Sequence, residues 1–255
     1  MAVRSAVQRD GLRADQLLVE RGLAPSRTTA QRLIEAGRVS WPEGVIARPS
    51  VLLPATAELA VRDDDADRCD RYVSRGGIKL AGALARTKLD VRGKACLDVG
   101  QSTGGFTDCL LQAGAAGVVG IDVGHSQLHV RLRNDPRVTC LEGVNARDLS
   151  KSAVAARRFD LIVGDLSFIS LTLVLSSLPA LLADDGDMLL LVKPQFEVGP
   201  ENVGKGGIVR DASLYPQVET KLRQAAEAAG LTVVDYFESP IAGTDGNREF
   251  FIWTK

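Results

Sequence analysis

From Lys94 to the end of the chain, short apolar runs alternate with stretches of helical spacing. The earlier runs predict five strands, at residues 95–99, 117–122, 137–141, 159–164 and 187–192. Two later runs predict strands at residues 232–238 and 249–254, and the glycine-containing turn between them suggests an antiparallel edge. Strands that alternate with helices indicate a parallel sheet, so we expect an α/β doubly wound fold with seven mostly parallel strands.

The first quarter of the chain has a different pattern. Residues 14–21 predict a short helix, and the hydroxyl of Ser26 can cap a second one. Residues 38–47 predict a hairpin, and residues 57–61 predict a further strand. We therefore expect a small α+β domain at residues 11–62.

An acidic run follows this small domain. Residues 63–67 include four aspartates, whose mutual repulsion predicts an extended and exposed segment. We place a linker at residues 63–73 and a second domain at residues 74–255. Residues 1–62 carry nine arginines and six acids, a balance of +3, whereas the rest carries 22 basic and 26 acidic residues, a balance of −4. The basic domain suggests a polyanionic partner, and a merely solvated surface is the alternative.

The composition is ordinary for a globular protein, with 45% hydrophobic and 25% charged residues. Serines and a proline interrupt the longest apolar candidate, residues 171–183, which is too short for a membrane span of about 18 residues or more. No apolar signal-peptide core follows the first arginines. The four cysteines lack metal spacing, and His125 and His129 have no companion ligands. We expect a reduced, cytoplasmic protein without a metal.

The stretch at residues 96–108 combines a strand, a glycine turn and the start of a helix. Such a corner lets the backbone approach a ligand, although the spacing is not that of a dinucleotide fingerprint. Asp122 closes the next strand, about 20 residues on, where a carboxylate can accept hydrogen bonds from ribose hydroxyls. We predict a nucleoside-containing ligand, and a plain strand–turn–helix with a capping side chain is the alternative.

Charged residues mark the ends of predicted strands. Asp165 and Lys193 each follow an apolar run, and Glu249 opens the last strand. Ligands of open α/β sheets bind beyond the carboxyl ends of the strands. Lys79 lies in the first turn of a predicted helix, which is electrostatically unfavourable for a cation and hints at a use. A buried ion pair between Asp165 and Lys193 that only closes the sheet is the alternative.

Two resemblances make these patterns specific. Residues 26–39 resemble the S4-type RNA-binding domain, a small fold shared by many RNA-modifying enzymes. Nearly the whole chain resembles the TlyA family of ribosomal RNA 2′-O-methyltransferases, many of which carry the name haemolysin. The second domain also resembles FtsJ-type ribose methyltransferases, whose Lys-Asp-Lys-Glu tetrad falls on Lys79, Asp165, Lys193 and Glu249. The stretches that carry the resemblance are 74–80, 98–107, 164–170, 192–199 and 246–251.

The resemblance implies a class I, Rossmann-like methyltransferase domain beside the small RNA-binding domain. It implies S-adenosylmethionine as cofactor and ribosomal RNA in ribosomal subunits as partner, with cytidine favoured; we expect a monomer that binds neither DNA nor membranes. The implied cofactor residues are Asp98, Gly100, Ser102, Thr103, Gly104, Gly105, Phe106, Asp122, Asn145 (at the adenine edge) and Asp165. The implied RNA-binding residues are Arg13, Arg27, Arg32, Arg38 and Arg48.

The tetrad suits chemistry on a ribose hydroxyl, which must lose its proton as it attacks a methyl group. We predict that Lys193 is either the general base or a stabiliser of the oxyanion. The nearby Lys79 and partial burial favour a neutral amine, whereas Asp165 and Glu249, which would orient the lysines, oppose it.

Three points stay open at this level. A glycine-rich stretch, residues 199–207, either closes over RNA beside the active face or is a solvent-exposed connection. A membrane-lytic haemolysin is an alternative function that rests on family naming, and no insertion segment is visible. An RNA-binding module with a vestigial methyltransferase fold is another, against which the tetrad and the glycine turn argue.

Overall fold

The computed structural model describes residues 11–24, 26–35, 37–61, 71–243 and 246–255. The chain forms two compact units, Met1–Asp67 and Arg68–Lys255. Of the predicted linker at 63–73, only residues 71–73 are among those described. None of the described helices is both long and apolar enough to cross a membrane.

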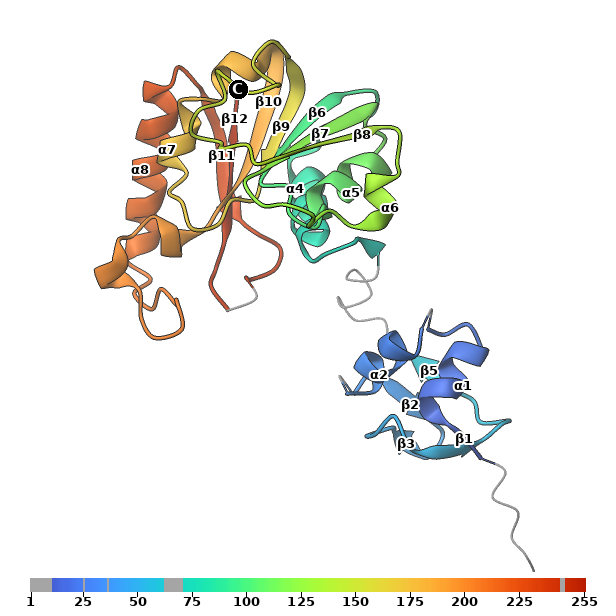
Figure 1. The fold of residues 1–255 in the computed structure, drawn as a ribbon. Helices are drawn as coiled ribbons and strands as arrows, with labels where there is room; N and C mark the ends of the chain where they lie inside the picture. The colour runs from blue at the N-terminus through green and yellow to red at the C-terminus, as the bar shows by residue number, and fades with distance from the viewer. Residues whose placement is uncertain (1–10, 25, 36, 62–70, 244–245) are drawn as a thin grey trace, which may run out of the picture. The chain divides into compact units, whose positions relative to one another are not determined.

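The small unit contains two helices and five short strands in its described part (Figure 1). Its helices are α1 (Ala14–Glu20) and α2 (Arg27–Glu35). One antiparallel pair joins β1 (Gly11–Arg13) to β4 (Leu52–Pro54), and a second sheet has the order β3 (Gly44–Val45), β2 (Val39–Trp41), β5 (Ala60–Val61). The sequence pattern missed β1 and β4, and β5 is shorter than the predicted strand at 57–61.

The two helices of the small unit share one apolar core. Leu17 and Leu18 of α1 pack in the same cluster as Leu33 and Ile34 of α2. The hydroxyl of Ser26 accepts a hydrogen bond from the Thr29 amide at 3.2 Å, which confirms the predicted cap. This compact core fixes the positions from which the unit presents its basic side chains.

The large unit is built on a seven-stranded sheet with the order β11-β12-β10-β9-β6-β7-β8. Its strands are β6 (Ala95–Val99), β7 (Gly117–Asp122), β8 (Val138–Glu142), β9 (Phe159–Gly164), β10 (Leu182–Val192), β11 (Val233–Glu238) and β12 (Phe250–Thr254). The pairs among β6 to β10 are parallel, whereas β12 runs antiparallel to both of its neighbours. The expected antiparallel edge is therefore confirmed: β11 is the edge strand, and β12 lies between β11 and β10.

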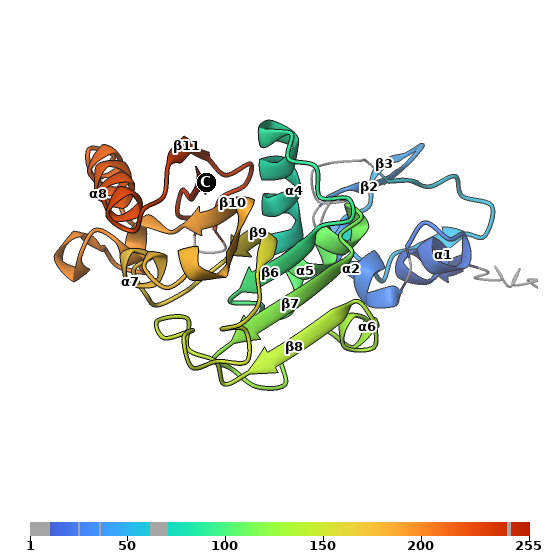
Figure 2. The same cartoon turned by 90° about the horizontal axis from the view of Figure 1, so that it is seen from above.

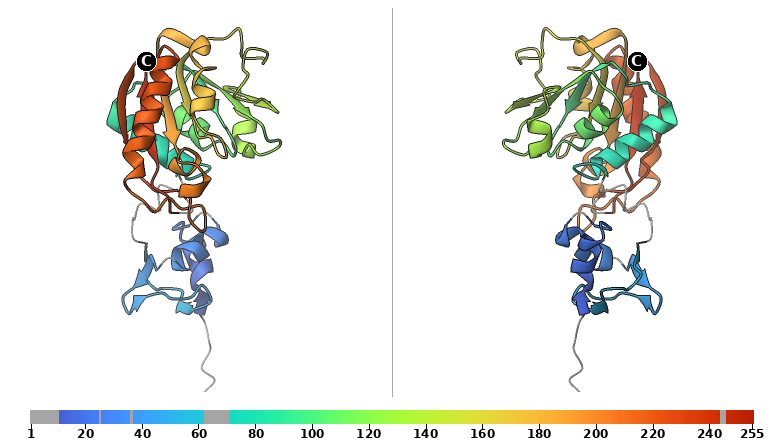
Figure 3. Two further views of the ribbon diagram at one scale, coloured as in Figure 1. Left: turned by 90° about the vertical axis from the view of Figure 1, so that its left-hand side faces the viewer. Right: turned by 90° about the vertical axis from the view of Figure 1, so that its right-hand side faces the viewer.

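Helices cover both faces of this sheet (Figure 2). One face carries α4 (Gly76–Thr87), α5 (Gly105–Gln112) and α6 (Val130–Arg133), and the other carries α7 (Thr172–Leu175) and α8 (Leu214–Ala228). Figure 3 shows the α8 side and the α4 side in turn. Short 3-10 turns lie on both sides of β10 in the chain. The turn η1 (Pro179–Leu181) comes directly before it, and η2 (Pro194–Phe196) and η3 (Pro200–Asn202) follow it.

Side chains alternate between the two faces along each strand. Cys96 and Leu161 belong to the core under α4 and α5, whereas Leu97 and Ile162 belong to the core under α7 and α8. Because both faces are covered, the strands are apolar runs without polar alternation, which is why the sequence located them well.

The topology brings the carboxyl ends of β6, β7, β9 and β10 to one edge of the sheet. The antiparallel β12 begins at that same edge. From β6, the chain adds β7 and β8 on one side of the sheet and then β9 and β10 on the other. Open α/β sheets form their ligand crevice at the point where the strand order changes direction in this way. Gly100 stands at this crevice with φ +84°, and a Cβ there would lie only 2.8 Å from the carbonyl oxygen of Asp165. A glycine is required for the two strand ends to approach so closely.

Candidate active site

The glycine turn, residues 100–105, is held from below by Asp98. The Asp98 carboxylate is buried in β6 and accepts hydrogen bonds from the amide and hydroxyl of Thr107, at 3.0 and 2.7 Å. Burial raises the pKa of Asp98 to about 7, since no cation contacts the carboxyl in the described structure. Asp98 therefore anchors the first turn of α5 to the sheet. It is not among the residues that line the three cavities described next.

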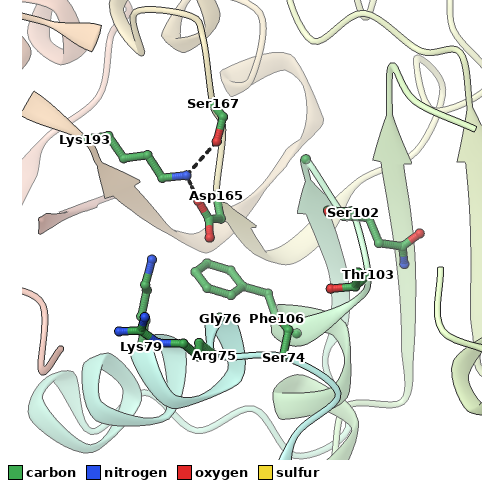
Figure 4. A pocket seen from close by; sticks show the side chains of 13 residues that line it. Ser74, Arg75, Gly76, Lys79, Ser102, Thr103, Phe106, Asp165, Ser167 and Lys193 are labelled. Atoms are coloured by element: carbon green, nitrogen blue, oxygen red, sulfur yellow. Dashed lines mark hydrogen bonds and ion pairs between the residues drawn. The ribbon is translucent and has the colours of Figure 1, made fainter. Parts of the chain in front are cut away.

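A cavity of about 430 Å³, here called the turn cavity, opens in front of the glycine turn. The turn itself forms one wall, with Gly100, Ser102, Thr103 and Gly105 among the lining residues, and Phe106 follows. Ser74 and Arg75 line it from the start of α4, and Asp165, Ser167 and Lys193 line it from the strand ends (Figure 4).

A second cavity of about 310 Å³, the Asp122 cavity, continues around the turn and shares Gly100, Ser102 and Asp165 with the first. Asp122 accepts a hydrogen bond from the Ser102 amide at 2.8 Å and another from the Gly124 amide at 2.7 Å. Each carboxylate oxygen retains a further lone pair, so this side chain can still accept hydrogen bonds from a ligand.

Four charged side chains form two ion pairs at the strand ends. Lys193 Nζ lies 2.6 Å from Asp165 Oδ1 and donates to Ser167 Oγ at 2.7 Å. Lys79 Nζ lies 2.6 Å from Glu249 Oε2. Figure 4 shows Lys193 and Lys79 reaching toward the Asp165 region from opposite sides. Residues more than a hundred positions apart in the chain thus meet at one edge of the sheet.

The pair formed by Lys79 and Glu249 is the more deeply enclosed of the two. Lys79 is 8% exposed and Glu249 is 3% exposed. Burial raises the pKa of the Glu249 carboxyl, and the Lys79 ammonium partly opposes that shift. A carboxylate in this setting depends on its lysine to remain charged.

A third cavity of about 390 Å³, here called the loop cavity, lies on the far side of the lysines. Lys79, Lys193 and Ser167 line both this cavity and the turn cavity. Gly206 and Gly207 line it as well, so the glycine-rich stretch at 199–207 borders the lysines. The lysines therefore stand between two spaces, which is the arrangement needed to bring two reactants together.

In the small unit, Asp15 gathers several polar side chains. Its carboxylate, which is fully buried, accepts hydrogen bonds from Arg13 at 3.0 and 3.1 Å, from Arg27 at 3.1 Å and from Gln31 at 2.9 Å. The hydrogen bonds from Arg13 hold the pKa of Asp15 well below its usual range. Arg13 and Arg27 stay 38% and 53% exposed, so each still faces solvent.

The other predicted RNA-binding arginines differ in position. Arg48 is exposed, whereas Arg38 is only 4% exposed. Burial of Arg38 conflicts with the prediction that its side chain faces phosphates. The sequence signature that pointed to Arg38 does not distinguish a core position from a surface one. The side chain of Arg32 lies outside the described structure.

Comparison with known proteins sets this geometry in a family. Residues 72–255 match the model of the FtsJ-like methyltransferase family, and residues 12–40 match the S4 domain. The chain is 46% identical to the 16S/23S rRNA (cytidine-2′-O)-methyltransferase TlyA of Mycobacterium tuberculosis, over 95% of this chain and 89% of that protein. The chain belongs to the TlyA family of FtsJ-like methyltransferases.

Other members of the TlyA family carry a different name. Hemolysin A of Brachyspira hyodysenteriae is 38% identical over 94% of this chain and 98% of that protein. A solved structure from Streptococcus thermophilus, described as a hemolysin, superimposes with a TM-score of 0.72 at 38% identity and covers 97% of this chain and 89% of that one. The hemolysin name thus labels proteins of the same family.

Some residues predicted for this TlyA-family chain lie away from the cavities. Asn145 is exposed and accepts a hydrogen bond from the Arg147 amide at 3.0 Å, while its neighbours Val144 and Ala146 line the Asp122 cavity. Asn145 is therefore not among the residues that line this cavity, and its place at the adenine edge stays a prediction. Gly104 is the N-cap residue of α5 and lies beside Leu128 and Leu132. It is not among the residues that line the turn cavity.

His125 and His129 are not among the residues that line the three cavities. His125 lies 3.6 Å from Glu142, and His129 accepts a hydrogen bond from the Arg131 amide at the start of α6. Within the described residues, no group of three or more histidine, cysteine or acidic side chains is suited to hold a metal ion.

Sequence reasoning assigned no site role to four side chains that line the turn cavity, those of Ser74, Arg75, Gln101 and Ser167. Gln101 is 3% exposed and donates to Thr107 Oγ1 at 2.9 Å. Its place inside the glycine turn was a usable signal. Ser167 lines the cavity and accepts a hydrogen bond from Lys193, but two residues after a strand end a serine has no distinctive sequence signature.

Proposed function

We propose that this chain transfers the methyl group of S-adenosylmethionine to the 2′-hydroxyl of a cytidine in ribosomal RNA. The observation that carries the proposal is the position of Lys79 and Lys193 between the turn cavity and the loop cavity. One space suits the methyl donor and the other suits the nucleoside. The relatives' printed names support the choice of ribosomal RNA and cytidine.

The residues of the turn fit this cofactor. Gly100 leaves room beside the Asp165 carbonyl, and Asp122 keeps lone pairs for two ribose hydroxyls. Ser102, Thr103 and Phe106 line the space for the amino-acid end. When bound, S-adenosylmethionine supplies an electrophilic methyl group. The cofactor residues predicted from the sequence are thus retained as proposals, although Asp98, Gly104 and Asn145 are not among the residues that line the three cavities.

Lys193 acts on the attacking hydroxyl. Asp165 and Ser167 hold its Nζ at 2.6 and 2.7 Å, so the amine has a fixed direction. As a neutral amine it takes the hydroxyl proton, and as an ammonium it stabilises the oxyanion that forms. Lys79 and Glu249 border the same space and orient the ribose. A base nitrogen offers a lone pair and would need neither lysine, which supports ribose as the target.

The small unit docks the RNA. Arg13, Arg27 and Arg48 are its exposed candidates for phosphate contact, and such contacts weaken with salt. We assign docking to residues 11–62 and methyl transfer to residues 74–255. We propose a monomer that acts on ribosomal subunits in the cytoplasm.

The test uses ribosomal subunits from a strain that lacks this gene. Purified protein with S-adenosylmethionine carrying a labelled methyl group should transfer label to the RNA of at least one subunit. A chain truncated to residues 68–255 should bind the cofactor but transfer label far more slowly. Absence of label from both subunits with the full chain would overturn the proposed function.

A further inference from the structure

Glu197 is a buried carboxylate to which the proposed reaction gives no part. It directly follows η2, which begins next to Lys193, and its side chain is only 2% exposed. It is not among the residues that line the three cavities. A buried carboxylate is costly unless neighbouring groups donate hydrogen bonds to it. Its partners therefore show what this side chain holds in place.

Most of the partners of Glu197 belong to the loop that follows β9, residues 165–171. Oε1 accepts a hydrogen bond from the Leu171 amide at 2.6 Å, and Oε2 accepts one from the Ser170 hydroxyl at 2.7 Å. Lys221 Nζ of α8 donates to Oε2 at 3.0 Å. Hydrogen bonds to an ionised group are stronger than those between neutral groups. The carboxylate of Glu197 therefore fastens the end of this loop to the segment after β10.

The same two segments meet a second time at the active site. Lys193 Nζ lies 2.6 Å from Asp165 Oδ1 and donates to Ser167 Oγ at 2.7 Å, so the loop supplies both partners of the amine (Figure 4). Lys193 and Glu197 lie at the two ends of one hydrogen-bonded turn, in which the Phe196 amide donates to the Lys193 carbonyl at 3.0 Å. Fastening the loop at Glu197 therefore also restrains the partners of the amine.

The loop between these two contacts needs such a restraint. Phe168 has φ +63°, a left-handed backbone conformation that is unfavourable for a residue other than glycine. A strained backbone persists only where the surrounding structure holds it. The Phe168 ring packs against Phe196 of η2, with 5.4 Å between the ring centroids. The hydrogen bonds to Glu197 hold the strained segment on its C-terminal side.

We propose that Glu197 is a positioning residue for methyl transfer, which directs the Lys193 amine by fastening the loop that carries the amine's two partners. This inference rests on the proposed function. Misplacing a reacting group by about 1 Å can lower a rate by about 10²-fold. Loss of the Glu197 carboxylate should therefore slow the transfer step more than it weakens the binding of cofactor or RNA.

Single-turnover transfer of a labelled methyl group from S-adenosylmethionine to ribosomal subunits tests this role. Glu197→Ala should lower the saturated rate by about 10- to 100-fold. The cofactor and subunit concentrations that give half the maximal rate should change by less than about threefold. Glu197→Gln should recover much of the rate, since its carboxamide oxygen can still accept from the Leu171 amide. Ser170→Ala removes one hydrogen bond to the carboxylate and should lose about three- to tenfold, which keeps the test available if Glu197→Ala does not fold.

Two comparisons separate positioning from a general loss of stability. Lys221→Met removes the α8 partner of the carboxylate and leaves the loop contacts, so it should lower the melting temperature and keep the transfer rate. The double variant of Ser167→Ala and Glu197→Ala should be no slower than the slower single variant, because both changes act through the Lys193 amine.

Three results would overturn the positioning role and leave the proposed function standing. They are an unchanged rate in Glu197→Ala, an equal loss of rate in Lys221→Met, and losses that multiply in the double variant. Failure of the wild-type chain to methylate any ribose would overturn both the role of Glu197 and the proposed function.

Discussion

The two units of this chain both place carboxylates beside cations, but they leave the cations in different surroundings. In the small unit, one buried carboxylate, Asp15, holds Arg13 and Arg27, which remain 38% and 53% exposed. In the large unit, Lys79 and Glu249 are both less than 10% exposed and face cavities. Half-exposed guanidinium groups suit contact with a string of phosphates, whereas an enclosed ammonium suits work on one hydroxyl. Exposure of the cation, more than the ion pair itself, separates docking from chemistry.

Removing the lysine that is assigned to the attacking hydroxyl should have the largest effect. Lys193→Ala should lower turnover by about 10²- to 10⁴-fold, the usual range for a lost proton-transfer group. Cofactor affinity should hold, because Lys193 lies outside the glycine turn. Lys79→Ala should act similarly but less severely. Single-turnover kinetics with labelled cofactor measures both. Lys151→Ala is the control, because the Lys151 side chain is 86% exposed. An equal loss of turnover in that variant would remove the distinction between the site lysines and a surface lysine.

Asp122, whose carboxylate accepts hydrogen bonds from backbone amides, tests the proposed cofactor site. Asp122→Ala should weaken S-adenosylmethionine binding by about 10- to 100-fold, as expected for hydrogen bonds to a charged group. Asp122→Asn, which keeps the size and one acceptor, should lose less. Calorimetry of both, beside the exposed Asp184→Ala, checks this. Unchanged affinity in Asp122→Ala would place the ribose contact elsewhere.

The docking side can be tested by a change whose sign depends on mechanism. Asp15→Asn raises the net charge of the small unit by one, so charge alone predicts tighter RNA binding. If Asp15 instead positions Arg13 and Arg27, binding should weaken by about three- to tenfold, with a shallower dependence on salt. Glu20→Gln, on the exposed side of α1, makes the same charge change without touching the arginines and should bind slightly more tightly. Equal behaviour of the two variants would reject positioning.

Asp98 acts on stability and gives the clearest contrast with Asp15. Burial raises the pKa of Asp98 to about 7, with no cation in contact with it among the described residues, and its favourable contribution is complete below the unfolded value of 3.8. That contribution disappears as pH rises through 7, with each pKa unit worth about 1.4 kcal/mol. The free energy of unfolding should therefore fall between pH 5 and pH 8 by denaturant titration. Asp98→Asn, which resembles the protonated form, should flatten this trend, and an unchanged slope would contradict it.

The sequence predicted the elements of the large unit well because its buried strands are apolar runs bounded by turn residues. β6, β7 and β9 coincide with the predicted strands at 95–99, 117–122 and 159–164. The place of β12 inside the sheet was not predictable, since pairing between distant strands leaves no local pattern. In the small unit, β1 and β4 have three residues each, too few for periodicity to show.

The candidate site was predicted in part. Asp165, Lys193 and Glu249 were found because a charge beside an apolar run is unusual, and Lys79 because a cation is unfavourable in the first turn of a helix. The structure brings all four to the same end of the sheet. Which lysine forms an ion pair with which carboxylate was harder to predict from the sequence. The ion pair of Asp165 with Lys193 was foreseen as an alternative, but that of Lys79 with Glu249 depends on how α4 packs. Likewise, nothing local distinguishes buried Arg38 from exposed Arg48.

The central claim is that the enclosed lysines act on a ribose hydroxyl. Mass spectrometry of nucleosides from ribosomal RNA, after reaction with the purified chain and S-adenosylmethionine, tests it directly. The account predicts a methyl group on the 2′-oxygen of cytidine, and its loss in Lys193→Ala. A methyl group on a base would contradict the role given to Lys79 and Lys193 and would leave the fold alone standing.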